Sequence, residues 1–118
     1  MSANSAAAPP PLQLNVQTTE DATVVRCSGH LTFDVSAMFK DEVRNLIPQT
    51  QRIVLDLTEL AYLDSSGLGA LASVYVSAKK AGCELRLINF NKRVRELLGI
   101  THMLSIFESF GQYNIKIP

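Results

Sequence analysis

Residues 53–69 read IVLDLTELAYLDSSGLG. The run 53–57 is almost wholly apolar, which is typical of a buried strand, and a long helical pattern begins soon after it. Ser65 and Ser66 stand where the strand and its loop pass into that helix. A helix start has unpaired backbone N–H groups and the positive end of the helix dipole. We therefore predict that these two hydroxyls cap the helix, at a place that also tolerates an added phosphate.

Three other apolar patterns predict strands, over residues 12–17, 22–27 and 84–88. The first two are joined by a short polar turn and should form a hairpin, which the pair Ser28-Gly29 ends. Strands and helices then alternate along the chain, and this order predicts parallel pairing through crossover helices. The expected fold is therefore α/β, with a mixed, mainly parallel sheet, an N-terminal hairpin and helices packed on it.

Three helices are predicted from apolar residues at helical spacing. The first is capped by Asp34 and ended by Pro48, and the second runs over residues 66–81 and is followed by Gly82. The third is capped by Asn91 and ended by Gly99. The predicted packing face of the second helix consists of Leu68, Leu71, Ala72, Tyr75 and Val76. The apolar residues predicted to form a last short strand or turn of helix are Leu104, Ile106 and Phe107.

The composition is that of an ordinary globular domain, with 118 residues of which 47% are hydrophobic. We predict one domain over 12–110, between a disordered leader, 1–11, and a C-terminal tail, 111–118. A formal net charge of zero gives no support to direct nucleic-acid binding, and no apolar run is long enough for membrane insertion. The leader has no signal-peptide pattern, so Cys27 and Cys83 are interpreted as buried free thiols in the cytoplasm.

The sequence does not predict an enzyme. Neither His30 nor His102 is linked locally to the serine pair, and the GxSxG pattern of serine hydrolases is absent. The stretch Gly67-Leu68-Gly69 lacks the Lys-Ser/Thr element of a nucleotide phosphate loop. No Cys/His pair has metal-ligand spacing, so no metal, cofactor or catalytic residue is expected. Asp56 and Asp64 are not predicted to form an acid–base pair, and Asp64 is expected to cap the helix or order the turn before it.

The segment LDLTELAYLDSSGLGAL and the elements around it closely resemble the STAS domain of bacterial anti-sigma factor antagonists. This resemblance implies a single STAS-like domain that acts as a switch. The unphosphorylated form would bind an anti-sigma factor, which is commonly also a serine kinase, and so release a sigma factor for transcription. Phosphorylation in the Asp-Ser-Ser-Gly segment would block that binding, and a PP2C-type phosphatase would reverse it.

Matching the motif by position makes Ser66, directly before Gly67, the preferred phosphorylation site, with Ser65 as the alternative. The resemblance also assigns partner contacts to two segments. These residues are Asp64, Gly67, Leu68, Gly69, Thr32 and Asp34. Family members often carry an acidic residue directly after a Gly-x-Leu unit, but here Thr32 stands at that place and the nearest acid is Asp34. This departure would suit a different partner.

Two other roles are compatible with the resemblance. Single STAS domains also serve as accessory subunits of membrane lipid ABC transporters, and others are components of stress-sensing STAS assemblies. The adjacent hydroxyls of Ser65 and Ser66 favour the switch, because a purely structural adaptor has no need for a helix start that can be modified.

Overall fold

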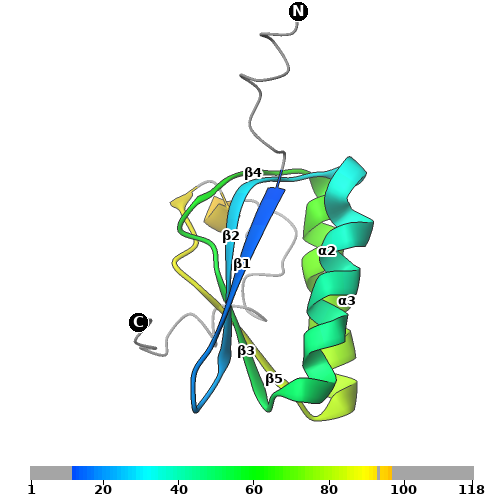
Figure 1. Ribbon diagram of the computed structural model, residues 1–118. Helices are drawn as coiled ribbons and strands as arrows, with labels where there is room; N and C mark the ends of the chain where they lie inside the picture. Colours follow the sequence, from blue (N-terminus) through cyan, green and yellow to red (C-terminus); the bar gives the residue numbers. More distant parts are fainter. Residues whose placement is uncertain (1–11, 93, 97–118) are drawn as a thin grey trace, which may run out of the picture.

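The strands form one sheet, and two helices cover one of its faces (Figure 1). The computed structural model describes residues 12–92 and 94–96. Along the chain the elements are β1 (Leu12–Thr18), β2 (Thr23–Leu31), α2 (Phe33–Leu46), a 3-10 turn η1 (Ile47–Gln49), β3 (Arg52–Asp56), β4 (Leu60–Leu63), α3 (Ser65–Ala81) and β5 (Glu84–Ile88). The leader, the tail, His102 and the apolar residues 104–107 lie outside the described residues.

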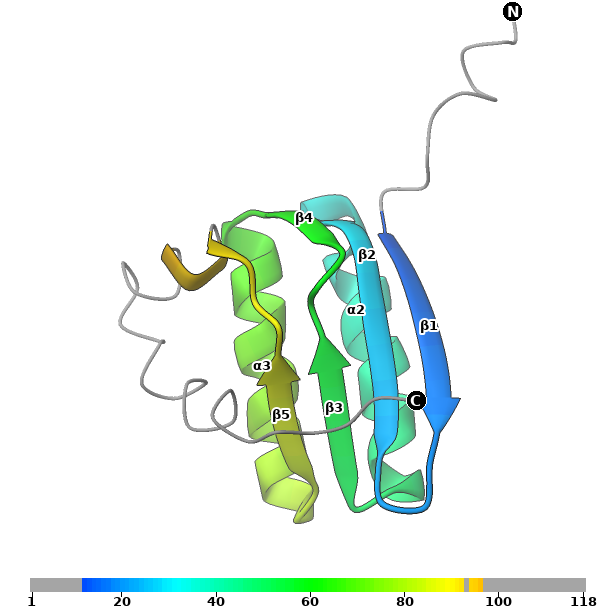
Figure 2. The same cartoon turned by 90° about the vertical axis from the view of Figure 1, so that its left-hand side faces the viewer.

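The sheet is mixed, with the strand order β1-β2-β3-β5 (Figure 2). Val16 of β1 lies opposite Val25 of β2 in the predicted antiparallel hairpin. Val25 also pairs in parallel with Leu55 of β3, and Leu55 pairs in parallel with Leu87 of β5. The α/β fold, its N-terminal hairpin and its parallel centre are therefore confirmed.

Strand β4 was not predicted, and β2 is longer than expected. Ser28-Gly29 does not end β2, because Gly29 takes a φ of 100° and the pairing register shifts between Gly29 and His30. Beyond this irregularity β2 extends past the end of β3, and β4 pairs with it there, with Leu31 opposite Leu63. The sequence between β3 and α3 lacks the strict alternation of a strand, since its outer residues, Leu60 and Leu63, are the buried ones.

The predicted bounds of α3, 66–81, agree with the structure to within one residue, but the predicted packing face was partly wrong. Leu71 and Leu68 are buried as expected, whereas Val76 is 50% exposed and Val74 and Ala78 are buried instead. Val76 follows Leu71 by five residues, which places it about 140° around the helix from Leu71. The helix ends as predicted, because Gly82 adopts the left-handed conformation with a φ of 75°.

The first helix, α2, begins two residues earlier than predicted. Its N-cap is Thr32 and not Asp34, which lies in the first helical turn. The helix proper ends at Leu46, and Pro48 stands in the 3-10 turn that follows. Asn91 is confirmed as the cap of a further helical segment, because its side-chain oxygen accepts a hydrogen bond from the backbone N–H of Val94 at 2.9 Å.

The main core lies between the sheet and the helices α2 and α3, and its largest fully buried side chains include Phe39, Leu55 and Leu71. Cys27 and Cys83 are confirmed as buried free thiols. Burial, assisted by the charge of Asp56, raises the pKa of the Cys27 thiol to about 12, so this thiol is protonated and unreactive at neutral pH. Within the described ranges, no helix is both long and apolar enough to span a bilayer.

Candidate functional site

The starts of α2 and α3 meet at the end of the sheet where β4 lies (Figure 1), and Asp64 joins them. Its Oδ1 accepts a hydrogen bond from the backbone N–H of Gly67 at 2.8 Å, which caps α3. Its Oδ2 accepts a hydrogen bond from the backbone N–H of Phe33, the first residue of α2, at 3.1 Å. A single carboxylate therefore lies at the positive ends of two helix dipoles, where negative charge is favoured.

The two serines occupy the first turn of α3 and do not cap it. Asp64 precedes them and takes the N-cap position, so the prediction that Ser65 and Ser66 are caps was wrong, and the expectation that Asp64 caps the helix is confirmed. Ser65 is exposed and Ser66 is partly buried. Neither hydroxyl makes a hydrogen bond to another of the described residues. Both are therefore uncommitted polar groups at a helix start.

The two glycines of Gly67-Leu68-Gly69 play different structural parts. A Cβ on Gly67 would lie 2.1 Å from the backbone oxygen of Leu31 and 2.7 Å from a methyl group of Leu63, so only glycine lets α3 approach β2 this closely. A Cβ on Gly69 would meet nothing within 4 Å, and Gly69 is exposed. Leu68 is buried. Of the three, Gly69 presents accessible surface next to the serines.

Thr32 and Asp34 flank the start of α2. The Thr32 hydroxyl donates a hydrogen bond to the Asp34 carboxylate at 2.6 Å instead of capping the helix backbone. Phe33, between them, has a side chain that is 77% exposed and a backbone N–H bound to Asp64. The structure therefore brings the two segments that the resemblance assigned to partner contacts to one end of the domain.

The sequence model of the STAS domain family matches residues 13–115. This chain is a member of the STAS domain family.

Similar proteins include an anti-sigma F factor antagonist from Paenibacillus polymyxa, which is 31% identical over 97 residues, with 80% of this chain and 83% of that protein covered. The unphosphorylated form of the anti-sigma factor antagonist SpoIIAA is similar in fold, with a TM-score of 0.70, 19% identity and 89% of each chain covered. The phosphorylated form of the Bacillus protein SpoIIAA has a TM-score of 0.67 and 18% identity, and the match covers 89% of this chain and 92% of that one.

Sequence reasoning missed Phe33 as a surface residue of this STAS domain. The apolar stripe of α2 consists of the buried residues Val35, Phe39 and Val43, which are four residues apart. Phe33 is two residues before Val35 and thus about 160° away from it around the helix. This phase was readable from the sequence, and it would have marked Phe33 as an aromatic side chain directed away from the core.

His30 and Tyr62 form a second feature at this end of the STAS domain. His30 lies in β2 and is exposed. Its ring makes an edge-to-face contact with the ring of Tyr62 on β4, with 6.0 Å between the ring centres. This contact joins the two strands that precede the helix starts, and aromatic pairs of this geometry stabilise neighbouring strands.

Asp56 is a buried carboxylate with a structural part in this STAS domain. It accepts hydrogen bonds from the backbone N–H and the hydroxyl of Thr58 at 3.0 and 2.6 Å, and from the side-chain amide of Asn89 at 3.2 Å. Arg26 lies 3.6 Å from its other oxygen. These contacts neutralise and satisfy the buried charge, and they tie the end of β3 to β2 and to the chain after β5.

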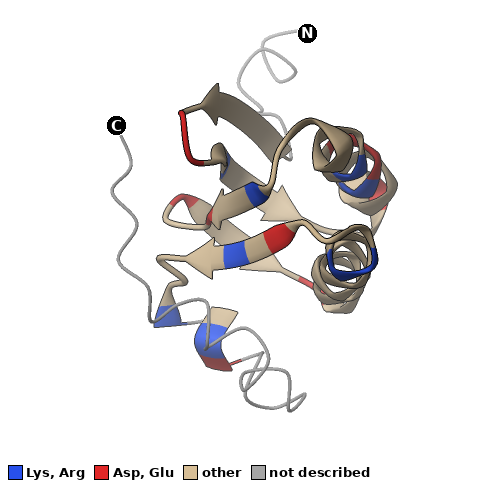
Figure 3. Cartoon of the chain, turned by 90° about the horizontal axis from the view of Figure 1, so that it is seen from below, with Lys and Arg blue, Asp and Glu red and all other residues tan. Residues whose placement is uncertain are grey.

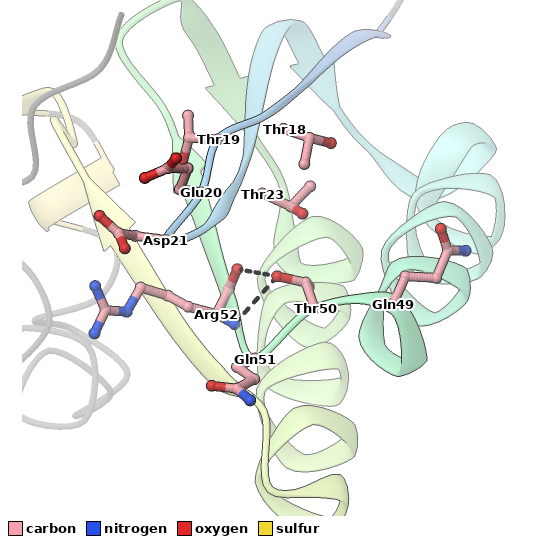
Figure 4. A pocket seen from close by; sticks show the side chains of 9 residues that line it. All are labelled: Thr18, Thr19, Glu20, Asp21, Thr23, Gln49, Thr50, Gln51 and Arg52. Carbon is pink, nitrogen blue, oxygen red and sulfur yellow. Dashed lines mark hydrogen bonds between the residues drawn. The ribbon is translucent and has the colours of Figure 1, made fainter.

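A hollow of about 530 Å³ lies at the opposite end of the domain from the serines (Figure 4). Its polar rim comes from the β1–β2 turn and from the chain that enters β3. The Thr50 hydroxyl donates a hydrogen bond to the carbonyl of Arg52 and accepts one from its N–H.

Charged residues of both signs are interspersed over the domain (Figure 3). The described residues contain no group of three His, Cys, Asp or Glu side chains that could hold a metal ion.

Proposed function

We propose that this STAS domain is a cytoplasmic anti-sigma factor antagonist that is switched by phosphorylation at the start of α3. The unphosphorylated protein binds an anti-sigma factor that is also a serine kinase, and it thereby releases a sigma factor. Phosphorylation of Ser66, or of Ser65, blocks binding, and a PP2C-type phosphatase restores it. The name of the Paenibacillus relative and the two phosphorylation states of SpoIIAA support the proposal.

One observation carries the proposal. Asp64 supplies the cap of α3, and the hydroxyls of Ser65 and Ser66 make no hydrogen bond to any other residue that the structure describes. A hydroxyl that caps nothing can gain and lose a phosphate while the domain stays folded. Such a site suits a reversible switch.

The effect of the phosphate on binding follows from its charge and size. Phosphorylation adds roughly −1.5 to −2 charges and three strongly hydrated oxygens. A partner surface shaped around a serine hydroxyl has no room for this group and would have to remove its water. The N–H of Gly67 already donates its hydrogen bond to the Asp64 carboxylate. The start of α3 therefore has fewer free N–H groups with which to stabilise the charge of a phosphate. The switch therefore acts on the interface and leaves the core unchanged.

The proposal gives this chain no catalytic residue, and the chemistry belongs to the kinase and the phosphatase. Ser66 is the preferred site because it directly precedes Gly67 in the motif. Ser65 is the more exposed of the two. Phosphate mapping by mass spectrometry after incubation with the partner and ATP separates the two serines.

The proposal is tested by a pull-down from the native organism with Ser66→Ala and Ser66→Asp proteins as baits. We expect the Ser66→Ala bait, and not the Ser66→Asp bait, to recover an ATP-binding kinase. Ser77→Asp is the matched control, because it adds the same charge three turns further along α3, where the hydroxyl already accepts a hydrogen bond from Arg44. Recovery of transporter ATPase and permease subunits by all baits would instead identify an accessory subunit of a membrane transporter.

A further inference from the structure

Phe33 is unusual among the apolar residues of this surface. Its side chain is 77% exposed, whereas the four other large exposed hydrophobic residues of the described chain are between 39% and 50% exposed. Scattered apolar side chains are ordinary on protein surfaces, so exposure alone carries no conclusion. The position of Phe33 and the way it is held distinguish it from the others.

The backbone of Phe33 is fixed at both of its polar groups. Its N–H donates to Oδ2 of Asp64 at 3.1 Å, and its carbonyl accepts a hydrogen bond from the Ser36 hydroxyl at 3.1 Å. The same Asp64 carboxylate holds the first turn of α3, on which Ser65 and Ser66 lie. The aromatic ring therefore projects into solvent from a rigid base that it shares with the serines. Because the backbone of Phe33 is already fixed, a partner that binds the ring has to order only the side-chain rotamer.

The charges beside Phe33 indicate what kind of surface would cover it. Asp34 is the next residue, and its exposed carboxylate is held by the Thr32 hydroxyl at 2.6 Å. The Asp64 carboxylate accepts a hydrogen bond from the backbone N–H of Phe33. An exposed aromatic side chain is thus followed directly by the exposed carboxylate of Asp34, and the complement of that pattern is an apolar pocket with a basic side chain at its rim.

We propose that Phe33 is the apolar anchor of the partner interface, and that the partner is a protein with an apolar pocket bordered by an Arg or Lys that faces Asp34. This inference rests on the proposed function and adds to it the residue that supplies most of the affinity. Buried aromatic side chains at the centre of an interface are the usual hot spots, and their truncation to alanine costs a large part of the binding energy. Thr32 is then a positioning residue that orients the Asp34 carboxylate.

The test is isothermal titration of the purified kinase recovered by the Ser66→Ala bait against wild type and variants. Phe33→Ala should weaken binding at least about 30-fold and leave the melting temperature unchanged. Asp34→Asn should weaken binding at low salt and make the affinity less dependent on the salt concentration. Val76→Ala is the matched control, because Val76 is also exposed but lies eleven residues after Ser65, about 16 Å along α3, and it should bind like wild type.

Several results would overturn the inference. If Phe33→Ala binds within about threefold of wild type while Ser66→Asp does not bind, the switch stands and Phe33 is not its anchor. A melting temperature lowered by Phe33→Ala would make the ring part of the fold. A change from dimer to monomer in Phe33→Ala would assign the ring to a contact between two copies of this chain. Equal binding of Ser66→Ala and Ser66→Asp would instead reject the proposed function itself, whatever Phe33 does.

Discussion

Asp64→Ala tests whether one carboxylate joins the two helices. The substitution removes the N-cap of α3, which costs about 1 kcal/mol, and the acceptor of the Phe33 N–H, which costs about 1 kcal/mol more. We therefore expect a loss of about 2 kcal/mol in the free energy of unfolding. For a domain of this size that loss lowers the melting temperature by roughly 8–16 °C.

Asp64→Asn separates the two contributions. Asparagine is a good N-cap, but its amide has one acceptor oxygen, so it can serve the Gly67 N–H or the Phe33 N–H and not both. The expected cost is about 1 kcal/mol, half that of the alanine variant. Urea denaturation of the three proteins, followed by circular dichroism, measures these differences as shifts of the midpoint at constant slope. If the asparagine variant loses as much stability as the alanine variant, or if neither loses any, the double role of Asp64 is refuted.

Three further predictions concern the glycines, the core and a thiol. Gly67→Ala should lower the free energy of unfolding by about 3 kcal/mol or more, because the added Cβ would lie 2.1 Å from the backbone oxygen of Leu31. Gly69→Ala meets open space and should instead stabilise α3 by up to about 1 kcal/mol. Thermal melts of the two variants check both signs. Leu71→Ala should cost about 2–5 kcal/mol, since the side chain is 0% exposed, and an unchanged denaturation midpoint would contradict the assigned packing face. The pKa of Cys27 is about 12 in the folded protein and about 8.5 in the unfolded chain. This difference stabilises the fold below about pH 8.5, and the contribution is lost as the pH rises from there towards 12. The denaturant midpoint of unfolding should therefore fall between about pH 8.5 and 12 for wild type, and fall less for Cys27→Ala.

The sequence predicted the parts of the fold that depend on strong local patterns. The β1–β2 hairpin, the extent of α3 and its glycine end follow from strict alternation, helical spacing and the left-handed conformation of Gly82. Strand β4 could not be predicted in this way. Leu60 and Leu63 are buried at a spacing of three, and they pair with β2 only because that strand continues past an irregularity at Gly29. This is a property of the folded sheet and not of the local sequence.

The candidate site was predicted in position but not in detail. The motif located both serines at the start of α3, but it offered three capping residues, Asp64, Ser65 and Ser66, because Asp and Ser are both good N-caps and the cap is set by one position in the chain. The bond from Phe33 to Asp64 joins residues 31 positions apart, and no spacing rule anticipates it. The exposure of Phe33 was within reach of the sequence, since it is out of phase with Val35 and Phe39.

The switch is tested most directly by the affinity of the purified anti-sigma factor for the unphosphorylated and the fully phosphorylated protein, measured side by side by titration calorimetry. The account predicts that the phosphate is mapped to Ser66 or Ser65 and that it weakens binding by about 100-fold or more, while the melting temperature of the domain is unchanged. Equal affinities of the two forms, or a phosphate mapped to any other residue, would contradict it.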